Sequence, residues 1–545
     1  MVGVADKVGT VRRVTANPNA KENTTMKRVL ILCGLITTSA FAYERLQGPT
    51  ELLFCDTNQA QPGYTLFGVG NRTYLLDLQG RVAHTWPVGT NPHLLENGNV
   101  LDASKDDPSG FQGFKEVDWD GRTVWEYTEK RADYAPHHDW VRIFNKKLHA
   151  PTTLYIANKS ISYDDAVAAG GDPKKVSMDG GQMDAIVEVD MQGNVIWEWC
   201  FFDHVVQDLD ATKPNYVGAG KTIADYPGRI NINMPGKPLR RDWLHCNTLD
   251  YNATSGHLVI NTVQGELYVI DHDGTFVAGD PKGSIAKAAS VAGDFLYRFG
   301  DPARYGQGEP PKILENWDNA TTGDKQMGGS HHVSWIPPGL PGAGHLLVFN
   351  NGQYLYQRTP GSSILEINPC LDADGHDTGK YVNPPVAGYR RETYDKDTHN
   401  APREISTQIV WSYRSQNSHG FFSHIGGSAQ RLPNGNTFIC SDTEGHFFEV
   451  TTDGKLVWEY INPVTRDFGT VKVLSDALPM VNSAFRAFRF APDFPAFKDR
   501  DLKPLGTITD AFAQAPHPKR PPGDNDPNRG GNRRGGGRGG NQGQQ

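Results

Sequence analysis

The sequence predicts an all-β protein, a six-bladed β-propeller made of four-stranded antiparallel blades. One pattern returns six times: alternating apolar residues, a polar turn with an acid and a glycine, and a second alternation that ends at an aromatic residue. Period-two alternation on both sides of such a turn is typical of a β-hairpin. Ahead of several copies comes a further strand with its own turn, as in HLLENGNVLDAS, TSGHLVINT and QRLPNGNTFICSD. These strands complete a four-stranded unit.

The six copies follow one another along the chain, with long loops at 200–240, 300–328 and 371–405 between some of them. Radial packing buries both faces of each unit and protects its edges, so repeated units favour a propeller. A stacked sandwich could use similar strands but would not need the same motif six times. The copies are YLLDLQGRVAHTW (74–86), FKEVDWDGRTVWEY (114–127), AIVEVDMQGNVIWEW (185–199), ELYVIDHDGTFVA (266–278), SILEINP with the later QIVWSY (363–369 and 408–413), and HFFEVTTDGKLVWEY (446–460).

The segment SAFRAFRFAPDFPAF (483–497) carries the last strand. A propeller closes by pairing strands from the two ends of the chain. We therefore expect residues 60–72 to share a blade with this segment.

The N-terminal region predicts export. The stretch MKRVLILCGLITTSAFAYE, from Met26, has a basic start, a short apolar run and an A-x-A pattern that ends at Ala42. These features are typical of a signal peptide over 26–42, preceded by a non-translated or disordered leader over 1–25. No later segment approaches the roughly 20 apolar residues of a membrane-spanning helix. We expect an exported protein, periplasmic or secreted, without a membrane span.

Composition assigns the rest of the chain. With 37% hydrophobic residues among 545, residues 43–510 can form a large core, the propeller. Residues 511–545 are rich in Pro, Gly, Arg and Asn and should be disordered. The net charge of −8 is spread over both signs and indicates no nucleic-acid partner. The cysteines of the mature chain show no C-x-x-C pair and leave disulfide pairing open: Cys55, Cys200, Cys246, Cys370 and Cys440.

Histidines recur where the innermost strands begin, in HHDWVRI (137–143), HCNTLDY (245–251), HHVSWIP (331–337) and FSHIGGSAQRL (422–432). His245 and His332 each lie four residues before an aliphatic residue, and His138 is close to that register. His93 and His424 lie near strand starts but do not share this register. A single histidine in such a place more often bonds a loop carbonyl than does chemistry. Several at matching positions of different blades predict one shared axial site.

Three segments carry a resemblance to a known family: H-x-N-x-(L/I)-D-Y-(D/N) at His245, H-x-x-W-(L/I) followed by LLVFNNG from His332 to Gly352, and GHFFEVT at His446. In order and placement they resemble the arylsulfotransferase family, over most of residues 65–500. The resemblance implies an exported aryl-sulfate sulfotransferase with a six-bladed propeller. It implies a phenolic sulfate donor, a phenolic acceptor, and neither a nucleotide donor nor a cofactor.

The resemblance also implies roles for residues. His446 is expected to be the nucleophile that becomes transiently sulfated, while His245, His332 and Arg358 orient the sulfuryl group. The HH doublet departs from the family's single histidine: His332 fits the register, and His331 is a neighbour or support. The expected substrate-binding residues are His138, His331, His424, Trp335, Tyr354 and Phe422.

The chemistry fits these residue types. Sulfuryl transfer should pass through a loose transition state by analogy with phosphoryl transfer. Arg358 and protonated His332 can bind the sulfuryl oxygens, and a neutral imidazole can serve as nucleophile. His245 can protonate the leaving phenolate and later deprotonate the acceptor phenol. Donor and acceptor then react in turn at one site, which is a ping-pong scheme. Whether the protein forms a homodimer is left open.

Two other classes compete with this interpretation. A non-catalytic propeller could bind phenolic or sulfated ligands without turnover. A metal or redox propeller could hold copper, zinc or iron with its imidazoles. Against the second, the sequence shows no recognisable ligand spacing, and Arg358 would repel a cation. We therefore expect no metal site.

Overall fold

The computed structural model describes residues 48–104, 112–310, 323–352, 361–392, 403–415, 420–465, 469–474 and 482–513. The predicted leader (1–25) and signal peptide (26–42) lie outside these residues, as does nearly all of the predicted tail (511–545). The propeller boundaries at 43 and 510 stay a prediction. The described residues contain no helix that is long and apolar enough to cross a membrane.

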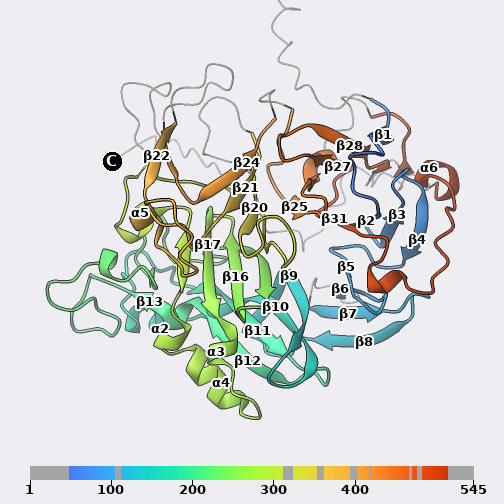
Figure 1. Cartoon of the computed structure of the whole chain (residues 1–545). Coiled ribbons are helices and arrows are strands. Elements are labelled where there is room, and N and C mark those ends of the chain that lie inside the picture. The colour runs from blue at the N-terminus through green and yellow to red at the C-terminus, as the bar shows by residue number, and fades with distance from the viewer. Residues whose placement is uncertain are drawn as a thin grey trace, which may run out of the picture. The chain divides into compact units, whose positions relative to one another are not determined.

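Six antiparallel sheets form the blades of a six-bladed β-propeller, which confirms the predicted fold (Figure 1). From innermost to outermost strand, blade 1 is β31 (Ala487–Phe490), β2 (Tyr64–Val69), β3 (Arg72–Leu76) and β4 (Val82–Trp86); blade 2 is β5 (His93–Leu94), β6 (Val100–Ser104), β7 (Gly113–Val117) and β8 (Thr123–Thr128); blade 3 is β9 (Tyr134–Asn145), β10 (Ala150–Ile161), β11 (Gly181–Val189) and β12 (Val195–Cys200).

Blade 4 is β15 (Cys246–Asn252), β16 (His257–Thr262), β17 (Glu266–Asp271) and β18 (Tyr297–Phe299); blade 5 is β19 (His332–Trp335), β20 (Leu346–Asn350), β21 (Ser363–Ile367) and β24 (Ile409–Tyr413); blade 6 is β25 (Ser428–Arg431), β26 (Thr437–Ser441), β27 (His446–Val450) and β28 (Leu456–Ile461). Short elements interrupt the loops: α2 (Tyr163–Ala168), β13 (Val205–Val206), β14 (Ile230–Asn231), α5 (Pro384–Ala387), β22 (Tyr389–Glu392), β23 (Arg403–Ser406), β29 (Val464–Thr465), β30 (Gly469–Thr470) and α6 (Ile508–Ala511).

The acid and the glycine of the repeated motif shape its turn. In the first copy Oδ1 of Asp77 accepts hydrogen bonds from the backbone N–H groups of Gln79 and Arg81. Gly80 takes a φ of 74°, in the left-handed region that favours glycine. Asp118 and Asp190 cap the equivalent turns of the next two blades in the same way. The carboxylate thus replaces backbone partners at the tip of each hairpin.

The tryptophan of the motif joins neighbouring blades. Its indole N–H donates from the fourth strand of one blade to the segment that follows the third strand of the next blade. Four blades use this clamp: Trp125 to the carbonyl of Met191 at 3.0 Å, Trp197 to Oγ1 of Thr275 at 3.0 Å, Trp411 to the carbonyl of Thr452 at 2.8 Å, and Trp458 to the carbonyl of Leu78 at 2.8 Å. The repeated aromatic residue therefore fixes the angle between blades as well as filling the core.

The ends of the chain close the ring as expected. β31 pairs antiparallel with β2, from Tyr64 opposite Phe490 to Phe67 opposite Ala487. In Figure 1 the red β31 lies beside the blue β2. The structure adds a strand that the sequence pattern does not predict: β1 (Glu51–Cys55) pairs with β28 and makes blade 6 five-stranded.

The fourth copy differs from the expected hairpin. Only its first half forms a strand, β17, because Asp271 caps a helical turn, α3 (His272–Thr275), by accepting from the N–H of Gly274. A second helix, α4 (Pro281–Ala288), follows with Asp280 as its cap and Pro281 in its first turn. The fourth strand, β18, comes only after these helices.

All five described cysteines are free thiols.

The closure is stabilised by a fully buried ion pair. Nη1 of Arg489, on β31, lies 3.4 Å from Oε2 of Glu449 on β27, and both side chains are 0% exposed. Nε of Arg489 also donates to Oγ1 of Thr65 on β2 at 2.8 Å. This side chain therefore joins blade 1 to blade 6.

We predict that Arg489→Met lowers the free energy of unfolding by about 3–5 kcal/mol, because it leaves the Glu449 carboxylate buried without its cation. Chemical denaturation measures the loss. The matched control is Arg81→Met, which breaks the pair with Asp77, where the arginine is 45% exposed; it should cost about 1 kcal/mol or less. Equal, small losses in the two variants would contradict the role assigned to Arg489.

Candidate active site

Each of the six innermost strands has a basic residue within four residues of its first residue. Because equivalent strands run in the same direction around a propeller, their starts gather at one end of the axis. The residues are His93 in β5, His137 and His138 in β9, His245 before β15, His331 and His332 at β19, His424 before β25, and Arg486 before β31. The sequence pattern predicted the histidines at five of the six strands, with the exception of His137. It did not predict Arg486 at the sixth strand.

A β-bulge sets the positions of His137 and His138. Trp140 pairs with Tyr155 and Pro136 with Ala157, so the three residues between Pro136 and Trp140 face only Ile156. His138 takes a φ of 57° there. His245 also has a φ of 57° and precedes a register shift in β15. Left-handed backbone at a residue other than glycine costs on the order of 1–3 kcal/mol and concentrates at functional sites.

Three imidazoles lie together at the starts of β9 and β15. The ring centroids of His138 and His245 are 4.5 Å apart, and those of His137 and His245 are 6.3 Å apart. Nδ1 of His138 lies 2.8 Å from Nδ1 of His137. On the other side of the ring, Nε2 of His137 lies 3.1 Å from Oδ1 of Asp184, which is fully buried.

This chain of contacts fits one arrangement of protons. With its proton on Nε2, facing Asp184, His137 can accept a hydrogen bond at Nδ1 from Nδ1–H of His138. That tautomer leaves the lone pair of His138 on Nε2. The imidazole of His138 is then oriented by the hydrogen bond to His137, whose Nε2 lies near the buried carboxylate of Asp184 without the geometry of a hydrogen bond.

His138 is neutral near pH 7. Burial lowers its pKa well below the ordinary value, and repulsion from His137, His245 and His331 lowers it further. The same interactions place His331 within electrostatic reach of His138. A neutral imidazole with a free Nε2 is a competent nucleophile.

His245 has the opposite character. Its Nδ1 lies 2.6 Å from Oδ2 of Asp242, and its side chain is 29% exposed. Burial alone would lower the pKa of His245, but the hydrogen bond to Asp242 and the charge of that carboxylate outweigh it, and the pKa is raised. For Asp242, burial is likewise outweighed by His245, and the pKa falls to about 2. The site thus sets a neutral imidazole beside one that favours its protonated form.

The structure divides the doublet His331–His332. Nδ1 of His331 lies 2.8 Å from Oδ1 of Asn351, and burial lowers the pKa of His331 to about 4. Its charged form would interact with His245, so His331 belongs to the cluster. His332 is as buried as His331, and its ring lies 5.7 Å from that of Phe488. Burial and the charge of Arg486 lower the pKa of His332 to about 3, which argues against the protonated role expected for it.

Arg486 holds the backbone of the cluster. Its Nη1 lies 2.8 Å from Oδ1 of Asp139, and its Nη2 donates to the carbonyl of Asn247 at 2.7 Å and to Oγ1 of Thr248 at 2.9 Å. Burial would raise the pKa of Asp139, but Arg486 outweighs it and the pKa falls to about 2. The signal for Arg486 was present in the sequence: it directly precedes the closing strand, as His245 precedes β15.

His446 lies elsewhere on its blade. It is on β27, the third strand of blade 6, with Nε2 2.9 Å from Oε1 of Glu459 and its ring 4.7 Å from that of Phe448. In the described part of the chain, none of its hydrogen bonds, ion pairs or ring contacts reaches His138, His245 or His331. The prediction that His446 is the sulfated nucleophile stays a prediction.

Three further predicted residues lie in the part of the chain that the structure describes. His424 precedes β25, with its ring 6.4 Å from that of half-buried Phe422. Trp335 is buried in the core between blades 4 and 5, where its backbone N–H donates to Oδ2 of Asp250. Arg358 and Tyr354 fall outside the described residues. Their roles also stay predictions.

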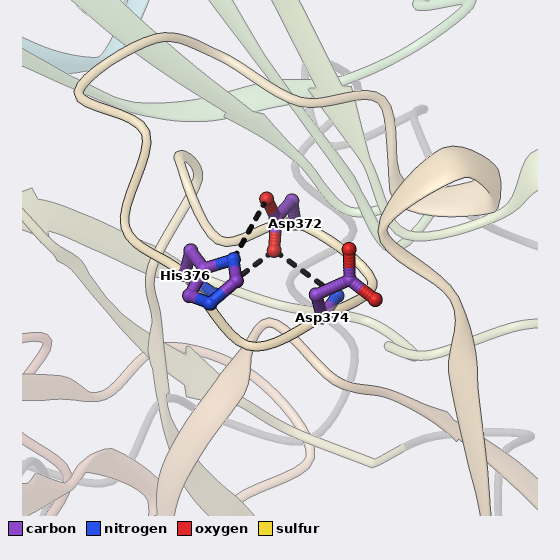
Figure 2. A group of neighbouring side chains, drawn as sticks. All are labelled: Asp372, Asp374 and His376. Atoms are coloured by element: carbon purple, nitrogen blue, oxygen red, sulfur yellow. Dashed lines mark hydrogen bonds and ion pairs between the residues drawn. The ribbon is translucent and has the colours of Figure 1, made fainter.

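A separate group of potential metal ligands lies on a surface turn. Figure 2 shows Asp372, Asp374 and His376 close together on one loop. Oδ1 of Asp372 accepts the backbone N–H groups of Asp374 and His376, at 3.0 and 2.9 Å. The carboxylate thus caps its own turn. Within the residues described, the axial histidines do not form a group of three converging ligand atoms of this kind.

Solved structures with a similar chain trace are remote. A protein of unknown function from Bacteroides caccae is 11% identical, with 79% of this chain and 99% of that chain covered and a TM-score of 0.36. The β-propeller domain of Myceliophteria thermophila Cps50 (Swd1) is 12% identical, with 77% and 88% covered and a TM-score of 0.33. The WD40 domain of Toxoplasma gondii coronin is 8% identical, with 87% and 96% covered and a TM-score of 0.33. Such TM-scores carry no inference, so the propeller assignment rests on the strand order.

No curated protein matches the chain. The family model for arylsulfotransferase (ASST) matches residues 67–474. This match covers the blades that carry His138, His245 and His331. The chain therefore belongs to the arylsulfotransferase family.

Proposed function

We propose that the protein is an aryl-sulfate sulfotransferase that moves a sulfuryl group from a phenolic sulfate ester to another phenol by a ping-pong route through a sulfated histidine. No nucleotide donor takes part. Membership of the family supports sulfuryl transfer in general. The observation that carries the finer proposal is the pair His138 and His245, a neutral imidazole 4.5 Å in centroid distance from one with a raised pKa.

In the first half-reaction, the lone pair on Nε2 of His138 attacks the sulfur of the donor. The bond between sulfur and the ester oxygen breaks, and its electron pair leaves on that oxygen. Protonated His245 donates its proton to the departing phenolate. The positive charge that develops on the imidazole of His138 is stabilised through Nδ1–H by His137 and the carboxylate of Asp184.

In the second half-reaction, a phenol replaces the product. Neutral His245 takes the proton from the phenolic oxygen, which attacks the sulfur. The bond between nitrogen and sulfur breaks, and its electron pair returns to Nε2 of His138. Donor and acceptor thus use one site in turn, and His245 is acid in one half and base in the other, as microscopic reversibility requires.

His446 is the alternative nucleophile, as the family resemblance implies. Its Nε2 is engaged by Oε1 of Glu459 at 2.9 Å, and its Nδ1 is buried, so neither ring nitrogen is open to a donor. For this reason we place the sulfuryl group on His138. Variants of the two residues separate the possibilities.

We predict that His138→Asn lowers the transfer of sulfuryl from 4-nitrophenyl sulfate to phenol at least about a thousandfold, because the nucleophile is removed. Asparagine tolerates the left-handed backbone of this position. Nitrophenol release measures turnover, and intact mass after donor alone measures the bound sulfuryl group. His446→Asn should keep both. The matched control is His149→Asn, at an exposed histidine of the same hairpin with a φ of 52°.

A different pattern would redirect the assignment. Loss of turnover and adduct in His446→Asn, with both retained in His138→Asn, would make His446 the nucleophile. A folded wild type that releases no nitrophenol over a range of aryl sulfates would favour the non-catalytic binding propeller.

We predict that Asp242→Asn moves the high-pH limb of kcat to lower pH. The protonated form of His245 is the acid, so donor cleavage is fastest below its pKa and is lost as pH rises through it. Asp242 raises that pKa, and its removal therefore brings the loss to lower pH. Phenyl sulfate, whose leaving group needs the proton most, is the donor of choice. An unchanged limb would show that His245 is not the acid.

A further inference from the structure

A cavity lies on the outer flank of blade 4, away from the axial histidines. It has a volume of about 180 Å³ and is lined by Phe295, Tyr297, Tyr305 and Tyr381, with Arg298 and Asn383 among the polar residues. Tyr297 and Arg298 belong to β18, the outermost strand of the blade, whereas His245 precedes β15, the innermost. Since β16 and β17 lie between them, the two places are separated by roughly 14 Å.

Three insertions that the propeller does not need build this cavity. Pro227 and Gly228 come from the long loop over 200–240, Tyr305 from the loop after β18, and Tyr381 and Asn383 from the segment before α5. These are the long loops that separate the sequence repeats. Segments far apart in the sequence therefore converge on one wall.

Hydrogen bonds fix these insertions to one another. Nε2 of Gln307 donates to the carbonyl of Ala224 at 2.6 Å, and its Oε1 accepts from Nδ2 of Asn383 at 2.7 Å. The N–H of Phe295 donates to the carbonyl of Gly228 at 2.9 Å. A cavity held in this way is formed before a ligand arrives, which lowers the entropic cost of binding.

The polar residues of the wall keep unused hydrogen-bonding capacity. Nη2 of Arg298, Oη of Tyr305 and Oδ1 of Asn383 are buried and have no hydrogen-bond partner. Arg298 and Tyr305 are 4% and 1% exposed. Buried polar atoms are nearly always paired in folded proteins, so three unpaired atoms around one cavity indicate a missing partner.

The charged groups behind the wall leave a donor for an anion. Glu266 is shared between Arg298, at 2.8 Å, and Arg304, at 3.1 Å. Asp301 lies 3.3 Å from Nε of Arg304, and Lys325 interacts with both Arg304 and Asp301. Burial lowers the pKa of Lys325, and with Glu266, Asp301 and the two arginines ionised the cluster is neutral and leaves one donor, Nη2 of Arg298, unused. An anionic oxygen can accept from that donor.

We propose that this cavity is an accessory binding site for a single-ring hydroxylated aromatic carboxylate. A cavity of about 150 Å³ accommodates benzene, so 180 Å³ suits one ring with small substituents. The aromatic walls pack against the ring, Arg298 and Tyr305 donate to the carboxylate, and Asn383 accepts from the hydroxyl group. The proposal does not depend on turnover at the axial site.

The probe is 4-hydroxybenzoate, titrated into the full-length protein by calorimetry. We expect this cavity to bind the probe with a Kd on the order of 10⁻⁴ M, given the few atoms of the ligand. As a phenol the probe can also enter the axial acceptor site, and the cavity variants separate the two events. Tyr305→Phe removes only the unpaired hydroxyl group and should weaken binding about fivefold without loss of thermal stability. The matched control is Tyr226→Phe, whose hydroxyl group donates to the carbonyl of Val217 outside the cavity lining; it should bind as the wild type does.

A variant that fills the cavity tests whether the ligand binds there or elsewhere on the protein. Leu296, at the cavity, is 39% exposed, so Leu296→Trp can occupy the space without disturbing the core, and it should abolish binding. His138→Asn, at the axis, should retain it. Absence of binding to the wild type, binding that survives both Tyr305→Phe and Leu296→Trp, or equal affinity for phenol would overturn the proposal.

Discussion

The buried ion pair between Arg486 and Asp139 is the interaction on which the axial site depends. Arg486 enters from blade 1, Asp139 belongs to blade 3, and Nη2 of Arg486 reaches the backbone of Asn247 in blade 4. It also lies 3.4 Å from the carbonyl of His331 at blade 5. One guanidinium thus holds the segments that carry His138, His245 and His331. Because breaking a buried pair leaves an uncompensated charge, the pair gives these segments little freedom to move.

Around this centre, side chains of one innermost strand satisfy the backbone of the next. Oδ2 of Asp139 accepts from the N–H of Leu249, and Oδ2 of Asp250 accepts from the N–H of Trp335. Just after β20, the second strand of blade 5, Nδ2 of Asn351 donates in the same way to the carbonyl of Ser423, in the loop before β25. Such rigidity can support the left-handed backbone of His138 and His245, and it meets the demand of catalysis that reacting groups be held within about 0.5 Å of productive geometry.

Local patterns in the sequence predicted the architecture because each has a local cause. The Asp and Gly of the motif make their own turn, and the tryptophan both fills the core and clamps the next blade. β1 was not predicted, since its pairing with β28 is non-local and its five residues carry no turn signal. The fourth copy of the motif was wrongly predicted to form a hairpin, because the caps of α3 and α4 interrupt its otherwise regular alternation of apolar residues.

The site was predicted in outline and not in detail. The register of His245 and His332 located the axial end of the blades, but a bulge brings in His137, and alternation cannot reveal a bulge. Nor could the sequence tell which histidine of the doublet reaches the cluster, because a shift of one residue reverses the face on which a side chain lies. The propeller itself needs none of these groups, and in the proposed function the chemistry resides in a few residues at the starts of the innermost strands.

The most direct test of this account is to locate the sulfuryl group. The wild-type protein is treated with an aryl sulfate in the absence of an acceptor, digested, and its peptides are sequenced by mass spectrometry under conditions that preserve the bond between nitrogen and sulfur. The account predicts a sulfuryl group on His138, which disappears when a phenol is added. A sulfuryl group on His446 or on any other residue, released by phenol in the same way, would contradict it.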